Sequence, residues 1–335
     1  DALPIFEELV AHQVSLLSRR AYIQQIEAPR ISASRQFAKQ LLSSLPFEMT
    51  NAQKRVSKEI VQDLKLNKPM LRLVQGDVGA GKTLVAGVAA CHVLEEGWQV
   101  ALMAPTEILA EQHYLNFKKW FEPLGLSVSW LSGKQKGKAR AAAEQAIVDG
   151  TAHLVVGTHA LFQDNVRFAK LGLVIIDEQH RFGVDQRLAL RNKGAQNMTP
   201  HQLVMTATPI PRTLAMSAYG DLDTSIIDEL PPGRTPIQTV TIPLDRREQV
   251  LQRIASNCRE GKQAYWVCTL VEQSETLDAQ AAEATYQEIK ERFPDINIGL
   301  VHGKMKADEK QAVMQAFKDN QSQLLIATTV IEVGV

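Results

Sequence analysis

The stretch GDVGAGKT, residues 76–83, constrains the fold of this chain more than any other feature. It follows an apolar run, MLRLVQ, and precedes a helix-like run, LVAGVAACHVLEEG. In a glycine-rich turn between a strand and a helix, the backbone N–H groups point into the loop and the helix dipole favours an anion there. The spacing G-x-x-x-x-G-K-T in this context therefore predicts a P-loop that binds the phosphates of a nucleoside triphosphate.

The members of this loop have separate expected roles. Backbone groups that surround the phosphates come from Gly76, Asp77, Val78, Gly79, Ala80 and Gly81. The Lys82 ammonium is expected to reach the β- and γ-phosphates, and the Thr83 hydroxyl to ligate Mg²⁺. The alternative is a tight turn that needs only its glycines, but a plain turn does not explain the Lys82-Thr83 pair.

A second nucleotide-site signal is the run LGLVIIDEQH, in which a buried strand ends in two acids. Ligands of parallel sheets lie at the carboxyl ends of the strands. We expect Asp177 to hold Mg²⁺ together with Thr83, and Glu178 to orient the attacking water as a general base. An acid pair that only caps a helix is the alternative, and the P-loop upstream argues against it.

Two further stretches are expected to contact or sense the nucleotide. In MTATPIPRTL, after another apolar strand, Thr206, Ala207 and Thr208 are expected to sense the γ-phosphate and couple its state to the rest of the chain. In FEMTNAQKRV, Gln53 is expected to hydrogen-bond the adenine edge and Phe47 to stack on the base. The alternatives are a proline-held turn, a solvated glutamine and a core phenylalanine.

The length and composition of the chain narrow the classes of protein to which it can belong. At 335 residues it is too long for one ordinary core, which favours two domains. Lys plus Arg and Asp plus Glu number 37 each, so any DNA site must be a local basic patch. The three cysteines lack metal-ligand spacing and indicate reduced thiols in a cytosolic protein. No stretch of about 18 consecutive apolar residues occurs, so we expect no membrane span.

Three segments follow one another along the chain. Residues 1–45 predict a helical connector, residues 46–230 a first α/β domain, and residues 231–335 a second α/β domain that is incomplete at its C-terminal end. The alternation of strand and helix patterns predicts mostly parallel, doubly wound sheets. A Pro- and Gly-rich segment, ELPPGRTPIQ, indicates the linker. Because the chain starts without methionine and stops within a patterned segment, we interpret it as a piece of a longer protein.

The motifs GDVGAGKT, APTEILAEQH, GTHALF, DEQHRFGVDQR and TATPIPRTL, in this order, resemble the superfamily-two helicases. Within them, DEQHRFGVDQR with ELPPGRTP resembles the RecG family, from about Pro46 to the end of the chain. The related Mfd proteins share GDVG-GKT and TATPIPRTL but typically have an acid where Gln179 stands. DEAD-box RNA helicases, with Ala-Asp after the acid pair, are less similar.

This resemblance implies two tandem RecA-like domains that form an ATP- and Mg²⁺-dependent motor on double-stranded DNA. Its substrates would be branched DNA, such as stalled replication forks and Holliday junctions, in recombination and repair. It further implies single-strand-binding protein as a partner, a monomer, and a bacterial cytosolic location. An Mfd-like translocase that acts on a protein partner is the alternative. The tandem second unit argues against a P-loop kinase or GTPase, and the intact motifs argue against a non-catalytic scaffold.

The resemblance also implies roles for particular residues. Gln179 and His180 would act beside Lys82, Asp177 and Glu178 in catalysis and coupling. The residues expected at the DNA backbone are Pro105, Thr106, Thr158, His159, His302, Lys304 and Thr329. The densest basic cluster consists of Lys134, Lys136, Lys138 and Arg140, and either binds phosphate or forms a solvated loop.

One family feature is missing from the sequence as it stands. The closing helicase motif carries an arginine finger, and no arginine follows Arg292. Arginine fingers are worth roughly 10³–10⁵ in rate. We therefore expect residues 1–335 alone to bind ATP but to hydrolyse it poorly.

Overall fold

The computed structural model describes residues 25–32, 35–133, 135–163, 165–177, 198–208, 222–230, 237–268 and 275–328, and, before these, Glu7, Val10, Ala11, Val14, Ser15, Ser18 and Ala21. The chain divides into two compact units, Asp1–Thr235 and Pro236–Val335. We call them the N-terminal unit and the C-terminal unit and describe each by itself.

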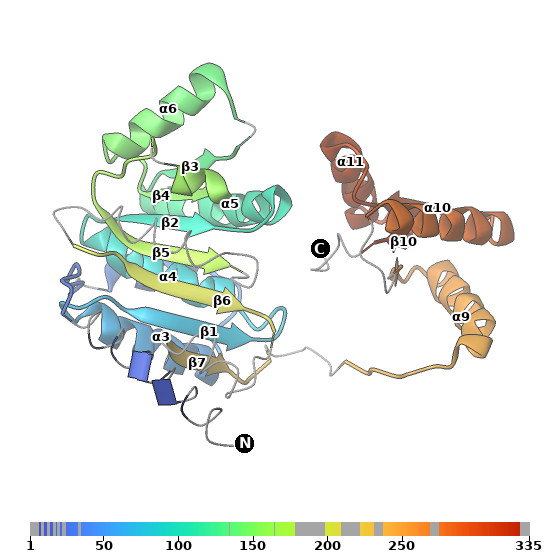
Figure 1. Ribbon diagram of the computed structural model, residues 1–335, viewed down its shortest axis with the longest axis horizontal. Helices are drawn as coiled ribbons and strands as arrows, with labels where there is room; N and C mark the ends of the chain where they lie inside the picture. The colour runs from blue at the N-terminus through green and yellow to red at the C-terminus, as the bar shows by residue number, and fades with distance from the viewer. Residues whose placement is uncertain are drawn as a thin grey trace. The chain divides into compact units, whose positions relative to one another are not determined.

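The N-terminal unit contains a seven-stranded sheet with the order β3-β4-β2-β5-β6-β1-β7. Its strands are β1 (Leu71–Gly76), β2 (Gln99–Met103), β3 (Val128–Leu131), β4 (Leu154–Gly157), β5 (Leu171–Asp177), β6 (His201–Thr206) and β7 (Asp223–Ile227). Every pairing in this sheet is parallel (Figure 1). Four of the six neighbouring pairs join strands that are not consecutive in the chain, as in a doubly wound fold.

Helices cover both faces of this sheet. They are α2 (Gln36–Ser44), α3 (Asn51–Leu64), α4 (Lys82–Glu95), α5 (Glu107–Phe121) and α6 (Gly137–Val148), with the short 3₁₀ helices η1 (Glu122–Leu124) and η2 (His159–Phe162). Residues of α2 to α5 form one core with the sheet, and residues of α6 and η2 belong to a second core. Because both faces are covered, all seven residues of β5 are buried, which explains its continuous apolar sequence.

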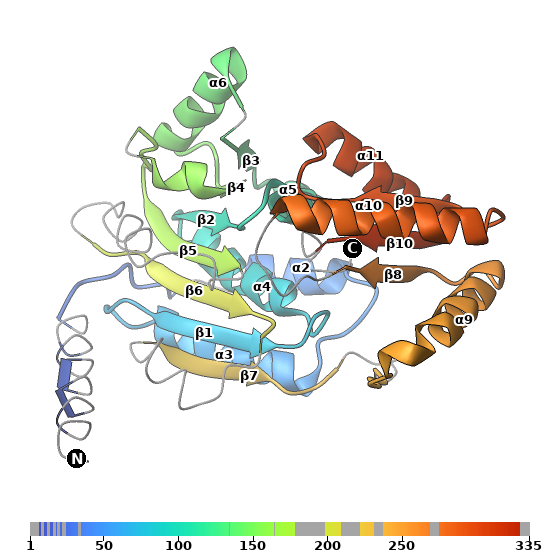
Figure 2. The ribbon, with the colours of Figure 1, turned by 45° about the vertical axis from the view of Figure 1, so that its right-hand side comes forward.

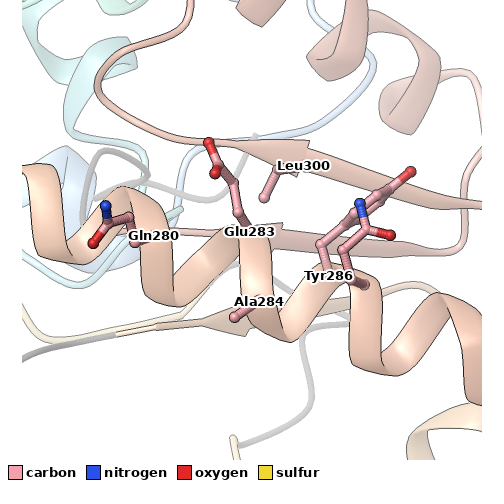
Figure 3. Close-up of a pocket in the computed structure, with 6 residues that line it drawn as sticks. Gln280, Glu283, Ala284, Tyr286 and Leu300 are labelled. Atoms are coloured by element: carbon pink, nitrogen blue, oxygen red, sulfur yellow. The ribbon is translucent and has the colours of Figure 1, made fainter.

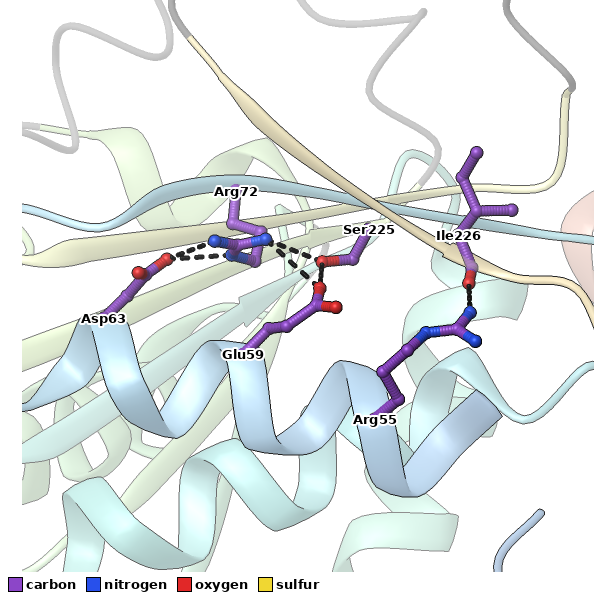
Figure 4. A network of polar contacts seen from close by, with 6 residues as sticks. All are labelled: Arg55, Glu59, Asp63, Arg72, Ser225 and Ile226. Carbon is purple, nitrogen blue, oxygen red and sulfur yellow. Dashed lines mark hydrogen bonds and ion pairs between the residues drawn. The ribbon is translucent and has the colours of Figure 1, made fainter. Parts of the chain in front are cut away.

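Polar contacts fix α3 against the edge of the sheet. The Arg72 guanidinium of β1 pairs with Asp63 at 2.7 Å and with Glu59 at 3.4 Å, both on α3. It also donates to Ser225 Oγ of β7 at 2.7 Å, and Arg55 donates to the Ile226 carbonyl at 2.8 Å (Figure 4). The Arg72 side chain is only 11% exposed, so these partners stabilise a charge that is largely removed from water. The network therefore fixes the position of α3 against β1 and β7.

The C-terminal unit contains a three-stranded parallel sheet with the order β8-β10-β9 among the residues that the structure describes (Figure 2). Its elements are η4 (Leu244–Arg246), α9 (Arg247–Arg259), β8 (Ala264–Val267), α10 (Glu275–Arg292), β9 (Ile298–Val301), α11 (Ala307–Lys318) and β10 (Leu324–Ala327). Leu251 of α9 and Ala282 of α10 share one core with the sheet, and Phe317 of α11 belongs to another. Both units are thus α/β layers around a parallel sheet, which confirms the predicted fold class.

No helix in the described part of the chain has both the length and the apolar character needed to cross a membrane.

His201 at the start of β6 is fully buried and bonded at both ring nitrogens. Its Nδ1 accepts from the Met70 backbone N–H at 3.0 Å, so Nε2 carries the proton and donates to the Pro29 carbonyl at 2.7 Å. Burial lowers the pKa of His201 from 6.5 to about 4. The folded state therefore holds this ring neutral.

We predict that His201 makes the stability of the chain fall between pH 6.5 and pH 4. In this range the unfolded state binds a proton that the folded state excludes, so stability is complete above the unfolded pKa and is lost as the pH falls towards the folded one. The loss is at most about 3 kcal/mol. Urea unfolding at several pH values would measure it, with His201→Asn as the non-titrating control. An equal pH dependence in both proteins would contradict the prediction.

Candidate nucleotide site and nucleic-acid edge

The P-loop connects β1 to α4 through glycines in the left-handed region. The φ angles of Gly79 and Gly81 are +78° and +86°, which residues with a Cβ atom rarely adopt. Gly81 is the N-cap of α4, and the helix begins at Lys82. The first N–H groups of α4, which lack partners within the helix, thus lie at the end of this loop. The loop has the backbone geometry that a phosphate requires.

Lys82 and Thr83 are the first two residues of α4. The Lys82 ammonium donates to the carbonyl oxygens of Gly76 at 2.8 Å and Asp77 at 3.1 Å. It therefore lies back over the loop itself. A phosphate would be a stronger partner for this ammonium than a neutral carbonyl, because charge-assisted hydrogen bonds are roughly twice as strong.

A pocket of about 900 Å³ opens beside the P-loop. It is lined by Phe47, Glu48, Met49, Thr50, Asn51, Gln53, Lys54, Gly79, Gly81, Thr83, Leu84, Trp120, Glu229 and Leu230. Its volume is in the range of small-molecule sites. Phe47 is 55% exposed, so its ring is accessible to a base, as the stacking role requires.

Gln53 is buried and joins α3 to the P-loop. Its Oε1 accepts from the Thr50 N–H at 3.0 Å, and its Nε2 donates to the Ala80 carbonyl at 2.8 Å. Gln53 also lines the pocket, and its role at the adenine edge stays a prediction. The contact to Ala80 was not predicted from the sequence, which assigned Gln53 only to adenine.

Glu229 is a pocket residue that sequence reasoning missed. Its Oε2 accepts from the Ala52 N–H at 2.9 Å, so the chain after β7 caps the N-terminus of α3. The residue lies in ELPPGRTP, which the sequence presents as a linker, and no local signal marks it as part of a nucleotide pocket. The capping bond joins positions 177 residues apart.

Asp177 ends β5, and its strand is separated from the P-loop strand only by β6. Asp177 pairs in register with Met205, which pairs with Val74 of β1. The end of β5 is therefore two strand spacings, or about 10 Å, from β1 across the sheet. At the end of β6, between the two, the hydroxyls of Thr206 and Thr208 lie 2.9 Å apart. The structure thus brings the P-loop, the Thr206–Thr208 segment and Asp177 to one half of the sheet edge.

A second residue that sequence reasoning missed contacts Asp177 directly. His113 of α5 lies with its Nε2 atom 2.6 Å from Asp177 Oδ2, and both side chains are largely buried. The stretch APTEILAEQH carries this histidine, but nothing in its spacing points to an acid 64 residues later.

Five predicted site residues lie outside the described residues, namely Glu178, Gln179, His180, Lys134 and Thr329. Their roles remain predictions.

The side chains of Thr83 and Asp177, the predicted Mg²⁺ ligands, are of a type that suits this cation. Both offer oxygen, which this cation prefers, and it usually keeps waters and phosphate oxygens as its other ligands. Asp177 is 9% exposed, so its buried carboxylate favours a cationic partner. Within the described residues no group of three or more His, Cys, Asp and Glu side chains gathers. A site completed by phosphate and water does not need such a group.

Four of the residues expected at DNA lie on the other half of the same edge. Pro105 and Thr106 follow β2, and Thr158 and His159 follow β4. These strands are paired, with Met103 opposite Gly157, and Gly157 also faces the end of β3. The parallel sheet therefore gathers three strand ends where a nucleic-acid backbone could approach.

The side chains at this edge differ in their exposure and in their hydrogen-bond partners. Thr106 accepts from the Leu109 N–H at 3.3 Å and so caps α5. His159 is exposed, whereas Thr158 is buried and its hydroxyl has no partner among the described residues. His159 is thus the better exposed donor for a phosphate.

The described residues of the basic cluster after β3 differ in whether their charge is already paired. The Arg140 guanidinium donates to Glu144 at 2.8 Å, to Gln163 at 2.7 Å and to the Ser132 carbonyl at 3.3 Å. It therefore holds α6 to its surroundings. Lys136 and Lys138, at the start of α6, are exposed and available to phosphate.

In the C-terminal unit, His302 and Lys304 follow β9. His302 is buried and its Nε2 lies 3.3 Å from Glu283 Oε1, while Lys304 is exposed. Glu283 also lines a shallow pocket of about 450 Å³ with Gln280, Ala284, Tyr286, Gln287 and Leu300 (Figure 3).

The profile of the DEAD/DEAH box helicases matches residues 50–217, half of the chain. The chain belongs to the DEAD/DEAH box helicase family. The profile of the helicase conserved C-terminal domain matches residues 245–335. Membership in this family implies that the chain uses a nucleotide.

Among curated proteins, this helicase chain is 62% identical over 333 residues to the ATP-dependent DNA helicase RecG of Escherichia coli (strain K12) and 46% identical over 331 residues to that of Aquifex aeolicus (strain VF5). These alignments cover 99% of the chain but 48% and 42% of the relatives. The chain thus spans about half the length of the curated relatives it matches. The resemblance to RecG is confirmed.

Solved structures give the same result. The structure of RecG bound to a three-way DNA junction superposes with a TM-score of 0.81 at 40% identity, over 98% of this chain and 43% of that one. Saccharomyces cerevisiae Dbp5, bound to RNA and ADP BeF3, has a TM-score of 0.65 at 14% identity, over 92% of this chain and 78% of that one. The second likeness shows the fold alone, and together with the family match it confirms tandem RecA-like domains.

We predict that Gly81→Ala in this helicase weakens nucleotide binding and lowers stability. A Cβ atom at φ +86° is strained by about 1–2 kcal/mol, and it would also collide with the Gln53 amide. Gly97→Ala is the matched control, because Gly97 has φ +76° and nothing within 4 Å of its Cβ position. Thermal unfolding and binding of a fluorescent ATP analogue would compare them. Equal behaviour of the two variants would contradict the role of Gln53.

We predict that the double variant Lys136→Gln, Lys138→Gln binds DNA more weakly whatever the DNA sequence. The slope of log binding constant against log salt concentration should become shallower by about 1–2. Arg140→Gln should instead lower stability, because it breaks three bonds within the unit. Affinities measured by fluorescence anisotropy over a series of salt concentrations would separate the two effects. An unchanged slope in the double lysine variant would assign these lysines to plain solvated surface.

Proposed function

We propose that this chain carries the ATP-driven motor of a DNA helicase that moves on double-stranded DNA and remodels branched DNA, including stalled replication forks and Holliday junctions. The observation that carries the proposal is the division of one sheet edge into a nucleotide half and a half lined by predicted DNA contacts. The 62% identity to RecG supports it, as does the printed three-way junction of the 40% identical structure. The motor would comprise domains 46–230 and 231–335 after the connector 1–45.

In this proposal ATP binds with its phosphates on the P-loop and its base in the pocket with Phe47, Gln53 and Glu229. Lys82 would neutralise phosphate charge, and Thr83 and Asp177 would hold Mg²⁺. The cation supplies charge stabilisation during phosphoryl transfer. Glu178 would orient the attacking water, and Gln179 and His180 would act beside it.

The DNA backbone would bind along the ends of β2, β4 and β3. Exposed groups there are His159, Lys136 and Lys138, and Lys304 offers a further cation in the C-terminal unit. Thr106 would contact a phosphate through its O–H or backbone. The segment with Thr206 and Thr208 lies between the P-loop strand and Asp177, a suitable place to couple hydrolysis to DNA.

The complete protein would act as a monomer in the bacterial cytosol, with forked DNA as substrate and single-strand-binding protein as a partner. The RecG relatives favour this reading over the Mfd-like one.

We predict that forked DNA stimulates ATP hydrolysis by the complete protein more than linear duplex or single strands do, and that Lys82→Ala abolishes it. Without the ammonium, charge on the transferring phosphoryl group loses a fixed partner. Steady-state ATPase assays with the three DNAs, beside a gel assay of fork conversion, would test both parts.

Lys262→Ala serves as the matched control, since Lys262 is exposed and pairs with Glu260 in the C-terminal unit, so that its loss is expected to leave both readouts unchanged. Equal stimulation by linear duplex and fork, without fork conversion, would replace the branched-DNA proposal with that of a duplex translocase.

A further inference from the structure

We propose that His113 is a positioning residue that fixes the Asp177 carboxylate for the cation and ties it to α5, the helix that begins at the nucleic-acid edge. This inference rests on the proposed function, because it assumes that Asp177 holds Mg²⁺. It adds a residue outside the P-loop and the acid pair to the nucleotide site.

The contact itself is short, buried and polar. His113 Nε2 lies 2.6 Å from Asp177 Oδ2, and the two side chains are 9% and 13% exposed. A carboxylate can only accept a hydrogen bond, so Nε2 carries the proton and donates it. Because Oδ2 is held in this way, the carboxylate has one orientation, and Oδ1 remains for a cation. Outer partners of metal-bound carboxylates act in this manner.

The other ring nitrogen argues against a purely structural histidine. His113 Nδ1 is buried and has no hydrogen-bond partner among the described residues. His201, a structural histidine of the same sheet, has partners at both nitrogens. The bond to Asp177 is thus the polar contact that accounts for a histidine at position 113. Phe117, one turn later on α5, lies beside the ring with the two centroids 6.4 Å apart.

The pair lies where the two halves of the sheet edge meet. β2 leads into the nucleic-acid half, β5 ends in Asp177, and the two strands are neighbours with Met103 opposite Ile176. Helix α5 follows β2, and its N-cap is Thr106. Seven residues of helix rise about 10 Å, so a rigid helix joins the predicted DNA contact at Thr106 to the acid through His113. A shift of α5 on DNA binding would reach Asp177 through this bond.

Two substitutions separate the hydrogen bond from packing. Gln keeps an N–H donor at about the reach of Nε2, whereas Leu keeps most of the volume and removes the donor. His153→Leu is the control, because His153 lies just before β4, at the opposite end from the predicted DNA contacts, and its ring contacts Ser127 instead.

The experiment measures binding of a fluorescent ATP analogue to the complete protein over a series of Mg²⁺ concentrations. We expect the His113→Leu protein to need roughly 10–100-fold more Mg²⁺ to reach half of the Mg²⁺-dependent gain in affinity for the nucleotide analogue. Its affinity for the analogue in EDTA should be unchanged. His113→Gln and His153→Leu should remain close to the wild type. In ATPase assays with forked DNA, His113→Leu should lower kcat and leave the DNA concentration for half-maximal stimulation unchanged.

Wild-type Mg²⁺ dependence in a folded His113→Leu protein would overturn the inference, as would equal defects in the Gln and Leu variants. Should His113→Leu fail to fold, His113→Asn gives the same comparison, because its amide is polar but too short to reach Asp177. If the wild type itself shows no Mg²⁺-dependent nucleotide binding, the proposed function fails instead.

Discussion

Parallel pairing of the seven strands in the N-terminal unit is the constraint on which the rest of the site depends. Because every strand runs the same way, every strand ends at one edge, and residues separated by long helices meet there. The order β3-β4-β2-β5-β6-β1-β7 then places the P-loop and Asp177 on one half of this edge and the ends of β2, β3 and β4 on the other. One continuous set of backbone hydrogen bonds thus holds the candidate nucleotide site at a fixed distance from the candidate DNA surface.

Around the P-loop, directional polar contacts fix the orientation of α3 against the sheet and the loop. Arg72 joins α3 to β1 and β7, and Gln53 then joins the start of α3 to the loop at Ala80. Glu229 closes the arrangement by capping α3 from the end of β7. The base pocket therefore depends on the position of α3, which Arg72 fixes through residues that do not line the pocket.

Residues of one type have different roles in this fold according to their surroundings. His201 is bonded at both ring nitrogens and held neutral by burial, whereas His113 uses one nitrogen to hold an acid. Arg140 binds within its own unit, while Lys136, four residues earlier, stays exposed. The charge of a residue does not by itself assign it to DNA. Its neighbours decide whether that charge is available.

The sequence by itself determined the P-loop, the strand that ends in Asp177, the alternation of strands and helices and the family. Each motif, strand and helix is a local pattern of consecutive residues, and the family follows from the order of these motifs along the chain. Only the tertiary structure decided that His113 contacts Asp177, that Gln53 holds the loop at Ala80, and that Glu229 belongs to the pocket. These contacts join positions 64, 27 and 177 residues apart. Strand order sets such contacts, and strand order leaves no periodic signal in the chain.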